Sequence, residues 1–239
     1  MLKVNQSLLH VLKKSGIYIS REKLSTREQF AQDIENEILK KSSGIIHLGA
    51  HLGQESERYS NFKIPVIWVE AIPTVYLKLM ENISKFNNQK AICALLGDKN
   101  NIEVKFNLAS NNYASSSIFT FGNEVRFKKL KMNSQMLLQM LRLDSIFSQD
   151  DLKIYEHWVV DVQGAELLVL KGAGNTFNNC KSLMIEVSTR QVYQEGVLWS
   201  ELESFLSNFN LMPLWQPQQK SHENILFVKT SFSSQKNKF

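Results

Sequence analysis

Residues 45–56, IIHLGAHLGQES, hold the pattern that decides the fold. The apolar run at 44–48 has the length of a buried strand, and Gly49 and Gly53 follow it. Glycines at this junction permit a tight turn and a close approach of the backbone to a ligand, and a helix beginning at Gln54 would offer its free N–H groups there. The stretch therefore predicts the strand, turn and helix with which an α/β sheet holds a nucleotide-like ligand.

The glycine spacing also limits which nucleotide is expected. The dinucleotide-binding fingerprint would need glycine at positions 49, 51 and 54, but His51 and Gln54 stand at two of them. A pyrophosphate cradle is therefore disfavoured, and a nicotinamide-dependent oxidoreductase with it.

Five further runs of strand length follow, at 66–69, 91–96, 157–162, 183–187 and 225–228. Helical patterns occur at 25–41, 73–86, 164–173 and 199–209. The first begins with Ser25 and Glu28 at capping-box spacing, and the second has Pro73 at its first position. Several strand runs are nearly continuous in apolar character, as in strands buried on both faces. The alternation predicts right-handed crossovers and a doubly wound, mostly parallel sheet with helices on both faces.

Residues 101–142 interrupt this alternation. The stretch NIEVKFNLAS alternates apolar and polar residues, as a half-exposed antiparallel strand does, and EVRFKKLKM at 124–132 is its candidate partner. We expect an inserted β-hairpin region over one edge of the sheet, beside the site. Residues 1–43 then form an N-terminal helical extension, 44–230 the main domain, and 231–239 a flexible tail.

Composition and charge set the broad class. The 239 residues are 43% apolar and 21% charged, which suits one α/β domain that folds alone, and the net charge of +5 is too small to indicate a nucleic-acid binder. The basic run at 126–131, RFKKLK, is either a solvated face or a holder of an anionic substrate. Cys93 and Cys180 lie in apolar runs, so no disulfide framework is expected. Without a cleavable signal or a membrane-spanning run, the expected localisation is cytoplasmic, and surface association through the amphipathic N-terminus stays open.

Four carboxylates fall at or just after predicted strand ends. Glu70 ends VIWVE, 21 residues after Gly49, where an acidic residue accepts both hydroxyls of a ribose; capping the following helix would explain it equally well. Asp161 follows the strand in HWVVDVQGAE, with Glu166 in the first turn of the next helix, and Glu186 comes from SLMIEV. The combination points to an adenosine ligand without a pyrophosphate.

Seven segments, in this order and spacing, closely resemble the FkbM-type family of class I S-adenosylmethionine-dependent methyltransferases: IIHLGAHLGQ, VIWVEAIP, LLGD, SSSIF, LRLDSIF, DVQGAELLVLKGA and IEVST. The likeness covers about residues 44–230. It implies a class I methyltransferase domain with a Rossmann-like, seven-stranded sheet whose last strand is antiparallel, and S-adenosylmethionine as the cofactor. Known members methylate hydroxyl oxygens, often on sugars, polysaccharides or macrolide-type natural products.

The resemblance also implies site residues. The loop after the first strand would line the methionine part of the cofactor, Glu70 the ribose, and the segment after the third strand the adenine. The implied cofactor contacts are Gly49, Ala50, His51, Gly53, Gln54, Glu70, Ala71, Leu96, Asp98 and Asp161. The implied substrate contacts are Ser115, Ser116, Ser117, Gln163, Glu166 and Glu186. Val159 stands where many relatives have Lys, two residues before the Asp, which puts a lysine-dependent step in doubt.

Methyl transfer from a sulfonium is an in-line displacement in which positioning supplies most of the rate. A sugar-like hydroxyl is a poor nucleophile, so a base that takes its proton would contribute further. Asp161 is the first candidate for this catalytic base and His51 the second, while a turn-stabilising role for Asp161 and a loop contact for His51 are the structural alternatives. No metal is expected, although Asp161 and Glu186 could supply two hard oxygen ligands.

The expected function is O-methylation of a sugar, glycan or natural product by in-line transfer, with a small-molecule or glycan acceptor and no nucleic-acid partner. A nucleic-acid methyltransferase is one alternative, and it would predict a stronger basic surface. A non-catalytic nucleoside-binding or scaffold protein is the other, and it would keep Gly49 and Glu70 but lose Asp161 freely. The acceptor pocket is expected from the least regular segments, 1–43, 101–142 and 189–200. The sequence indicates neither the acceptor's identity nor the oligomeric state.

Overall fold

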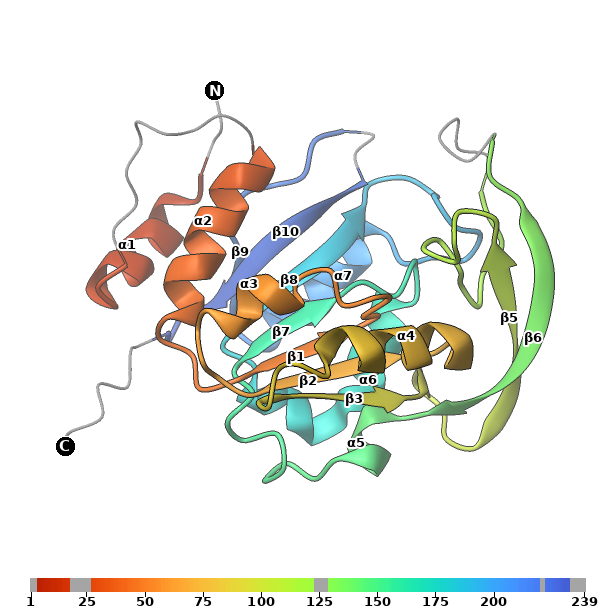
Figure 1. The fold of residues 1–239 in the computed structure, drawn as a ribbon. Helices are drawn as coiled ribbons and strands as arrows, with labels where there is room; N and C mark the ends of the chain where they lie inside the picture. The colour runs from red at the N-terminus through yellow and green to blue at the C-terminus, as the bar shows by residue number, and fades with distance from the viewer. Residues whose placement is uncertain (1–3, 18–26, 123–128, 220–221, 233–239) are drawn as a thin grey trace.

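Strand β1 (Ile45–Leu48) lies inside a seven-stranded sheet, parallel to β2 (Val66–Glu70) on one side and to β7 (His157–Val160) on the other. The computed structural model describes residues 4–17, 27–122, 129–219 and 222–232 (Figure 1). The sheet order is β3-β2-β1-β7-β8-β10-β9, completed by β3 (Gln89–Cys93), β8 (Ser182–Ser188), β9 (Leu211–Pro213) and β10 (His222–Lys229). Strand β10 runs antiparallel to both β8 and β9, and the other strands of this sheet share one direction, which confirms the expected Rossmann-like, mostly parallel architecture.

Helices cover both faces of this sheet. In Figure 1, α2 (Arg27–Leu39), α3 (Ser56–Ser60) and α4 (Pro73–Ile83) lie in front of it, and α6 (Glu166–Ala173) and α7 (Trp199–Ser207) lie behind. Successive side chains of β7 point to opposite faces of the sheet, so this strand contacts the helices on both sides. Trp158 packs on Phe177 of the 3-10 helix η3 (Gly174–Asn179), with ring centroids 5.2 Å apart, whereas Val159 faces the side of α2 and α3. Both faces of the central strands are thereby buried.

The one polar side chain inside β1 is satisfied as expected. His47 is buried, stacks on Trp68 with centroids 4.9 Å apart, and shares a hydrogen bond between its Nδ1 and the Tyr59 hydroxyl. Burial, which penalises the charged imidazolium, lowers the pKa of His47 to about 4. This histidine is therefore neutral at physiological pH.

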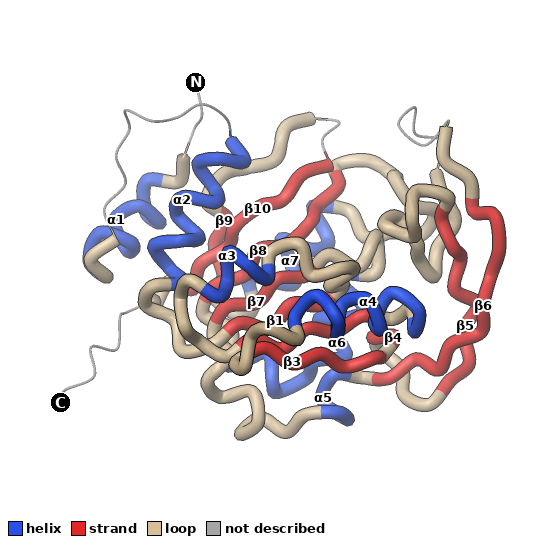
Figure 2. Tube along the Cα trace, in the orientation of Figure 1, coloured by secondary structure: helices blue, strands red, loops and turns tan. Residues whose placement is uncertain are grey.

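The insertion at 101–142 supplies two strands of a second, three-stranded sheet, whose order is β4-β6-β5 (Figure 2). Strand β5 (Ile102–Ala109) matches the expected antiparallel strand, and β4 (Leu95–Leu96) is the end of the predicted run 91–96, which leaves the main sheet after Cys93. The predicted partner at 124–132 is wrong: β5 pairs with β6 (Met132–Leu141), and residues 123–128 lie outside the described part of the chain. Apolar Leu137 on the exposed face of β6 obscures the alternation that would have revealed this strand.

The N-terminal helices pack on the main core. Leu8 and Leu12 of α1 (Gln6–Lys14) and Ile34 and Ile38 of α2 are buried in the same hydrophobic cluster as the sheet. The predicted helices end within a few residues of the observed ones, and α3, α5 (Leu143–Ile146) and the short β9 carried no clear signal. Ser25 of the expected capping pair, the side chain of Glu28 and residues 233–239 of the tail lie outside the described residues. No described helix has the length and apolarity needed to cross a bilayer.

Candidate functional site

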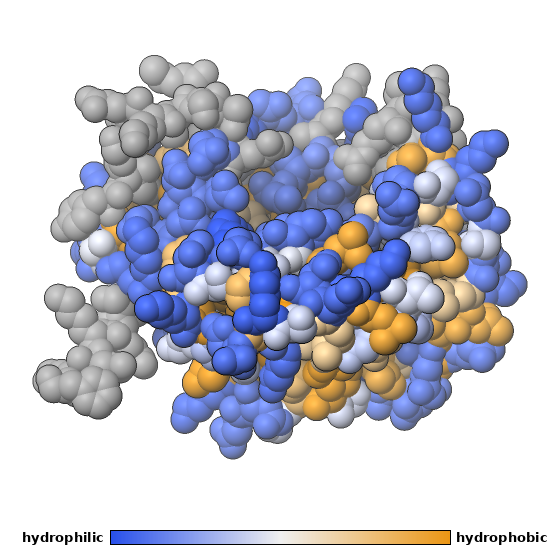
Figure 3. Space-filling view, in the orientation of Figure 1, coloured by the Kyte–Doolittle hydropathy of each residue, from blue (hydrophilic) through white to orange (hydrophobic). Residues whose placement is uncertain are grey.

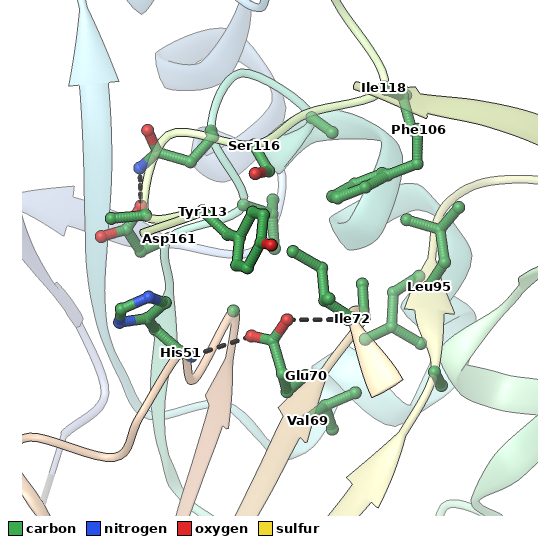
Figure 4. Close-up of a pocket in the computed structure, with 18 residues that line it drawn as sticks. His51, Val69, Glu70, Ile72, Leu95, Phe106, Tyr113, Ser116, Ile118 and Asp161 are labelled. Carbon is green, nitrogen blue, oxygen red and sulfur yellow. Dashed lines mark hydrogen bonds between the residues drawn. The ribbon is translucent and has the colours of Figure 1, made fainter. Parts of the chain in front are cut away.

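A pocket of about 610 Å³, counting its opening to solvent, lies at the carboxyl ends of β1, β2 and β7. The insertion covers one side of it, so residues far apart in sequence share its wall (Figure 4). Its lining is Gly49, His51, Val69, Glu70, Ala71, Ile72, Ala94, Leu95, Leu96, Phe106, Tyr113, Ala114, Ser116, Ile118, Asp161, Val162, Gln163 and Ala165.

The floor of the pocket depends on close contact between two strand ends. The Asp161 N–H donates to the Leu48 carbonyl at 3.0 Å, which continues the β1–β7 pairing into the loops. Gly49 has φ of 87°, and a Cβ added there would lie 1.8 Å from the Asp161 carbonyl oxygen. Only glycine fits both conditions. The close backbone approach at Gly49 is to the β7 loop, and the predicted approach to a ligand stays a prediction.

Glu70 is buried at the end of β2 and faces the pocket. One carboxylate oxygen accepts the His51 N–H at 2.9 Å, and the other accepts the Ile72 N–H at 2.8 Å, just before α4 (Figure 4). Burial raises its pKa, and these backbone donors oppose that shift. The capping role is thus present, and it is compatible with ligand binding, because each carboxylate oxygen can accept a second hydrogen bond.

The far wall of the pocket is apolar. Ile72, Leu95 and Phe106 belong to one buried cluster, and Ile118 packs against it. In Figure 4 these side chains stand across from Asp161, with the Tyr113 ring between the two sides. A flat aromatic group such as an adenine could lie against this wall, next to the carboxylate of Glu70. The sequence offered no signal for Tyr113, and Phe106 was visible only as part of an alternating strand.

On the opposite wall, Asp161 is held in a polar network. The Gln163 side-chain amide donates to Asp161 Oδ1 and to Glu186 Oε2, the second at 3.0 Å, and its oxygen accepts the Tyr193 hydroxyl at 2.5 Å. Burial and the nearby Glu186 raise the pKa of Asp161 to about 8. A carboxyl with such a pKa can hold or accept a proton near neutral pH.

Glu166 adds a third carboxylate to this group. It is buried, one of its oxygens accepts the Val162 and Gly164 N–H groups at 3.2 and 3.0 Å, and burial raises its pKa to about 8. Among the described residues, Asp161, Glu166 and Glu186 are the one set of potential metal ligands whose oxygens lie within 4.8 Å of one another. From the sequence, only Asp161 and Glu186 were candidates for two hard oxygen ligands, so the third carboxylate was not expected.

The imidazole of His51 is engaged at both nitrogens. Its Nε2 lies 2.9 Å from the Asn112 carbonyl, and its Nδ1 lies 3.0 Å from Nε2 of Gln54. The carbonyl can only accept, so Nε2 carries the proton and Nδ1 accepts from the amide. His51 therefore joins the first loop to the insertion, which favours its interpretation as a loop contact over that as a base.

The three serines meet the site in different ways. Ser116 lines the pocket, and its hydroxyl accepts the Ala109 N–H at 3.0 Å. Ser117 donates to the Gln163 carbonyl at 2.7 Å, and the Ser115 hydroxyl accepts from Asn111 at 2.9 Å. Of these bonds, the one from Ser117 joins the insertion to the β7 loop, and the other two lie within the insertion. Of the three, only Ser116 lies on the pocket wall.

Several expected site residues lie behind the wall or away from it. Ala50 is buried in the core beneath the loop, and the backbone carbonyl of Asp98 accepts from Arg142 at 3.0 Å. The expected residues that do not line the pocket are Ala50, Gly53, Gln54, Asp98, Ser115, Ser117, Glu166 and Glu186. Val159, at the position where many relatives have lysine, lies on the α2 side of β7.

Comparison with known proteins adds an independent finding. Residues 47–211 match the family model of the methyltransferase FkbM domain, and no curated protein matches the chain. Similar solved structures include fibrillarin of Aeropyrum pernix with natively bound S-adenosyl-L-methionine (13% identity, TM-score 0.45, covering 80% of this chain and 68% of that one). Precorrin-6y C5,15-methyltransferase of Geobacter metallireducens is another (13% identity, TM-score 0.45, covering 90% and 96%).

Proposed function

The chain belongs to the FkbM methyltransferase family, whose cofactor is S-adenosylmethionine, and from this premise we propose that it methylates a hydroxyl oxygen of a sugar, a glycan or a related natural product. The observation that carries the proposal is the position of Asp161, a half-buried carboxyl with a pKa of about 8 on the wall of the pocket that also holds Glu70. A group that accepts a proton near neutral pH suits attack by a hydroxyl, which must lose its proton.

The pocket fits the cofactor by the chemistry of its walls. The carboxylate of Glu70 would accept the two ribose hydroxyls, and the side chains of Leu95 and Phe106 would flank the adenine. The loop at Gly49 would hold the methionine part. When bound, S-adenosylmethionine supplies a methyl group on a positively charged sulfur.

The chain's own residues then position the acceptor and move its proton. Alignment of the two reactants alone can lower the activation barrier by roughly 7–11 kcal/mol, so the packed ends of β1 and β7, which fix the pocket, contribute a large part of the rate. Asp161 takes the hydroxyl proton, and Gln163 fixes the orientation of its carboxylate. His51 and Ser117 keep the insertion in place over the pocket.

The test is transfer of a labelled methyl group from S-adenosylmethionine to carbohydrate and nucleic-acid fractions. We expect the label on carbohydrate oxygen, identified by mass spectrometry after hydrolysis, with Asp161→Asn losing roughly 10²–10⁴-fold in turnover and keeping its affinity for S-adenosylhomocysteine. Label on nucleic acid or on nitrogen would refute the oxygen acceptor. Full activity of Asp161→Asn would remove Asp161 from the mechanism, and binding of the cofactor with no transfer to any fraction would favour a scaffold role.

A further inference from the structure

A second cavity lies on the face of the main sheet beneath α2 and α3, and Asp161 lines both cavities. Its walls come from α2, from α3 and its preceding turn, and from side chains of β1, β7, β8 and β10. We call this cavity the α2 groove. Because Asp161 belongs to both, a molecule in the α2 groove and one in the first pocket would meet at this carboxyl.

The charged arginine of the α2 groove is paired with a carboxylate. Arg58 Nη1 lies 2.8 Å from a carboxylate oxygen of Glu35, whose other oxygen lies 3.0 Å from His157 Nε2. His47, the other basic residue in the described lining, is neutral because burial lowers its pKa to about 4. Glu55 adds a negative charge. The described lining therefore presents no cation that lacks a carboxylate partner, so a phosphate or sulfate would be poorly stabilised there.

The remaining lining suits hydroxyl groups. Gln32 of α2 and Asn224 of β10 are exposed amides that can both donate and accept, and between them Val159 and Met184 supply a small apolar floor. Figure 3 shows that the surface around α2 and α3 is mostly hydrophilic. A sugar ring has the same mixture of hydroxyl edges and an apolar C–H face.

We propose that the α2 groove is the acceptor site and that it takes an uncharged, polyhydroxylated molecule such as a neutral sugar. This assignment of the acceptor site rests on the proposed function. It adds to that function a role for helix α2 in substrate recognition. In the transfer, the acceptor oxygen bonds to the methyl carbon, the carbon–sulfur bond breaks with its electron pair passing to sulfur, and the hydroxyl proton passes to Asp161. The products are the methyl ether and neutral S-adenosylhomocysteine.

The experiment fills the groove without touching the first pocket. Gln32→Trp and Asn224→Trp place a large ring at exposed positions of its walls, and Glu37→Trp, on α2 but outside the groove lining, is the matched control. The probe is a mixture of neutral oligosaccharides from hydrolysed glucan, mannan and galactan, with glucose 6-phosphate as the charged comparison. Labelled S-adenosylmethionine is the donor, and calorimetry with S-adenosylhomocysteine reports on the first pocket.

We expect the wild type and Glu37→Trp to label the neutral pool in preference to glucose 6-phosphate. The two groove variants should lose at least tenfold in kcat/KM, chiefly through KM, while their affinity for S-adenosylhomocysteine stays within twofold of the wild type. Wild-type rates in both groove variants would overturn the site, and no labelling of the neutral pool, or a preference for the phosphorylated sugar, would overturn the acceptor class. Failure of S-adenosylhomocysteine to bind the wild type would instead refute the proposed function.

Discussion

Oε1 of Glu35 lies 3.0 Å from Nε2 of His157, so that a residue of α2 is bonded to the first residue of β7, 122 positions further along the chain. The other nitrogen of His157 contacts the Ser182 hydroxyl at 2.8 Å, and the other oxygen of Glu35 accepts from Arg58. These groups are largely buried. The network holds α2 against the amino-terminal end of β7, opposite the end that faces the pocket. Helix α2 also forms one wall of the α2 groove.

Glu35→Ala should lower the free energy of unfolding by about 3 kcal/mol, because it strands Arg58 and His157 without their shared carboxylate. The Glu35 pKa is lowered in the folded protein by His157 and Arg58, against the opposing effect of burial. Its stabilisation is therefore present above the unfolded pKa and is lost as the pH falls through the folded one. Urea denaturation at pH 7 and pH 3 measures this, with Glu37→Ala, which removes a half-exposed carboxylate paired with Lys40, as the control. A difference between Glu35→Ala and wild type that is the same at both pH values would contradict it.

Asp161→Asn should stabilise the protein at alkaline pH. The folded-state pKa of Asp161 is raised to about 8, so the unfolded chain loses this proton first, and stability falls as the pH rises from about 4 to about 8. An amide cannot ionise, and the variant should show a weaker decline. Thermal unfolding at pH 5 and pH 8.5 tests this. Equal pH dependence in the two proteins would mean that the carboxyl does not hold its proton in the fold.

Glu70→Gln should weaken binding of S-adenosylhomocysteine by about 1–3 kcal/mol, the usual cost of a lost hydrogen bond to a charged group. The amide oxygen can accept only one of the two backbone N–H groups that now bond to different oxygens of Glu70, so thermal unfolding of the variant is measured alongside binding. An analogue without ribose hydroxyls separates the two roles by calorimetry. It should bind the wild type weakly and the variant no worse. If the variant discriminates between the two ligands as strongly as the wild type, Glu70 does not hold the ribose.

Gly49→Ala should disrupt the pocket, because its Cβ would meet the Asp161 carbonyl at 1.8 Å. The loop ends of β1 and β7 must separate, so we expect a loss of more than about 2 kcal/mol in stability or no cofactor binding. Chemical denaturation and calorimetry measure the two effects. If neither the free energy of unfolding nor the cofactor affinity changes, the Asp161 carbonyl does not lie against Gly49.

Metal chelation should leave turnover unchanged. The Gln163 amide lies between Asp161 and Glu186 and donates to both, which is the position that a bridging cation would need. Activity is compared in EDTA, in excess Mg²⁺ and in excess Ca²⁺. Loss of turnover in EDTA and its return with Mg²⁺ would show that the three carboxylates bind a metal ion and that the Gln163 amide moves away from them.

Much of the main sheet could be predicted from the local sequence pattern. The continuous apolar runs of β1, β2 and β7 and the glycines after β1 specify strands buried on both faces and a turn that only glycine allows, and neither depends on distant residues. The carboxyl ends of parallel strands share one edge, so the proximity of Glu70 and Asp161 to one pocket also followed. The partner of β5 did not, because the face of β6 is mixed and pairing over a long loop is set by tertiary contacts.

The sequence by itself determined the parallel sheet, the glycine turn and the carboxylates at its edge, because period, chain order and glycine geometry are local properties. Only the tertiary structure decided that His51 would be occupied at both nitrogens, that Glu166 would join Asp161 and Glu186, and that α2 would wall a groove reaching Asp161. Those outcomes depend on how segments far apart in the sequence pack together; Gln29 and Asp161, which line the same groove, are separated by 132 positions. Hydrogen-bond occupancy and burial shift a pKa only once those segments are packed together.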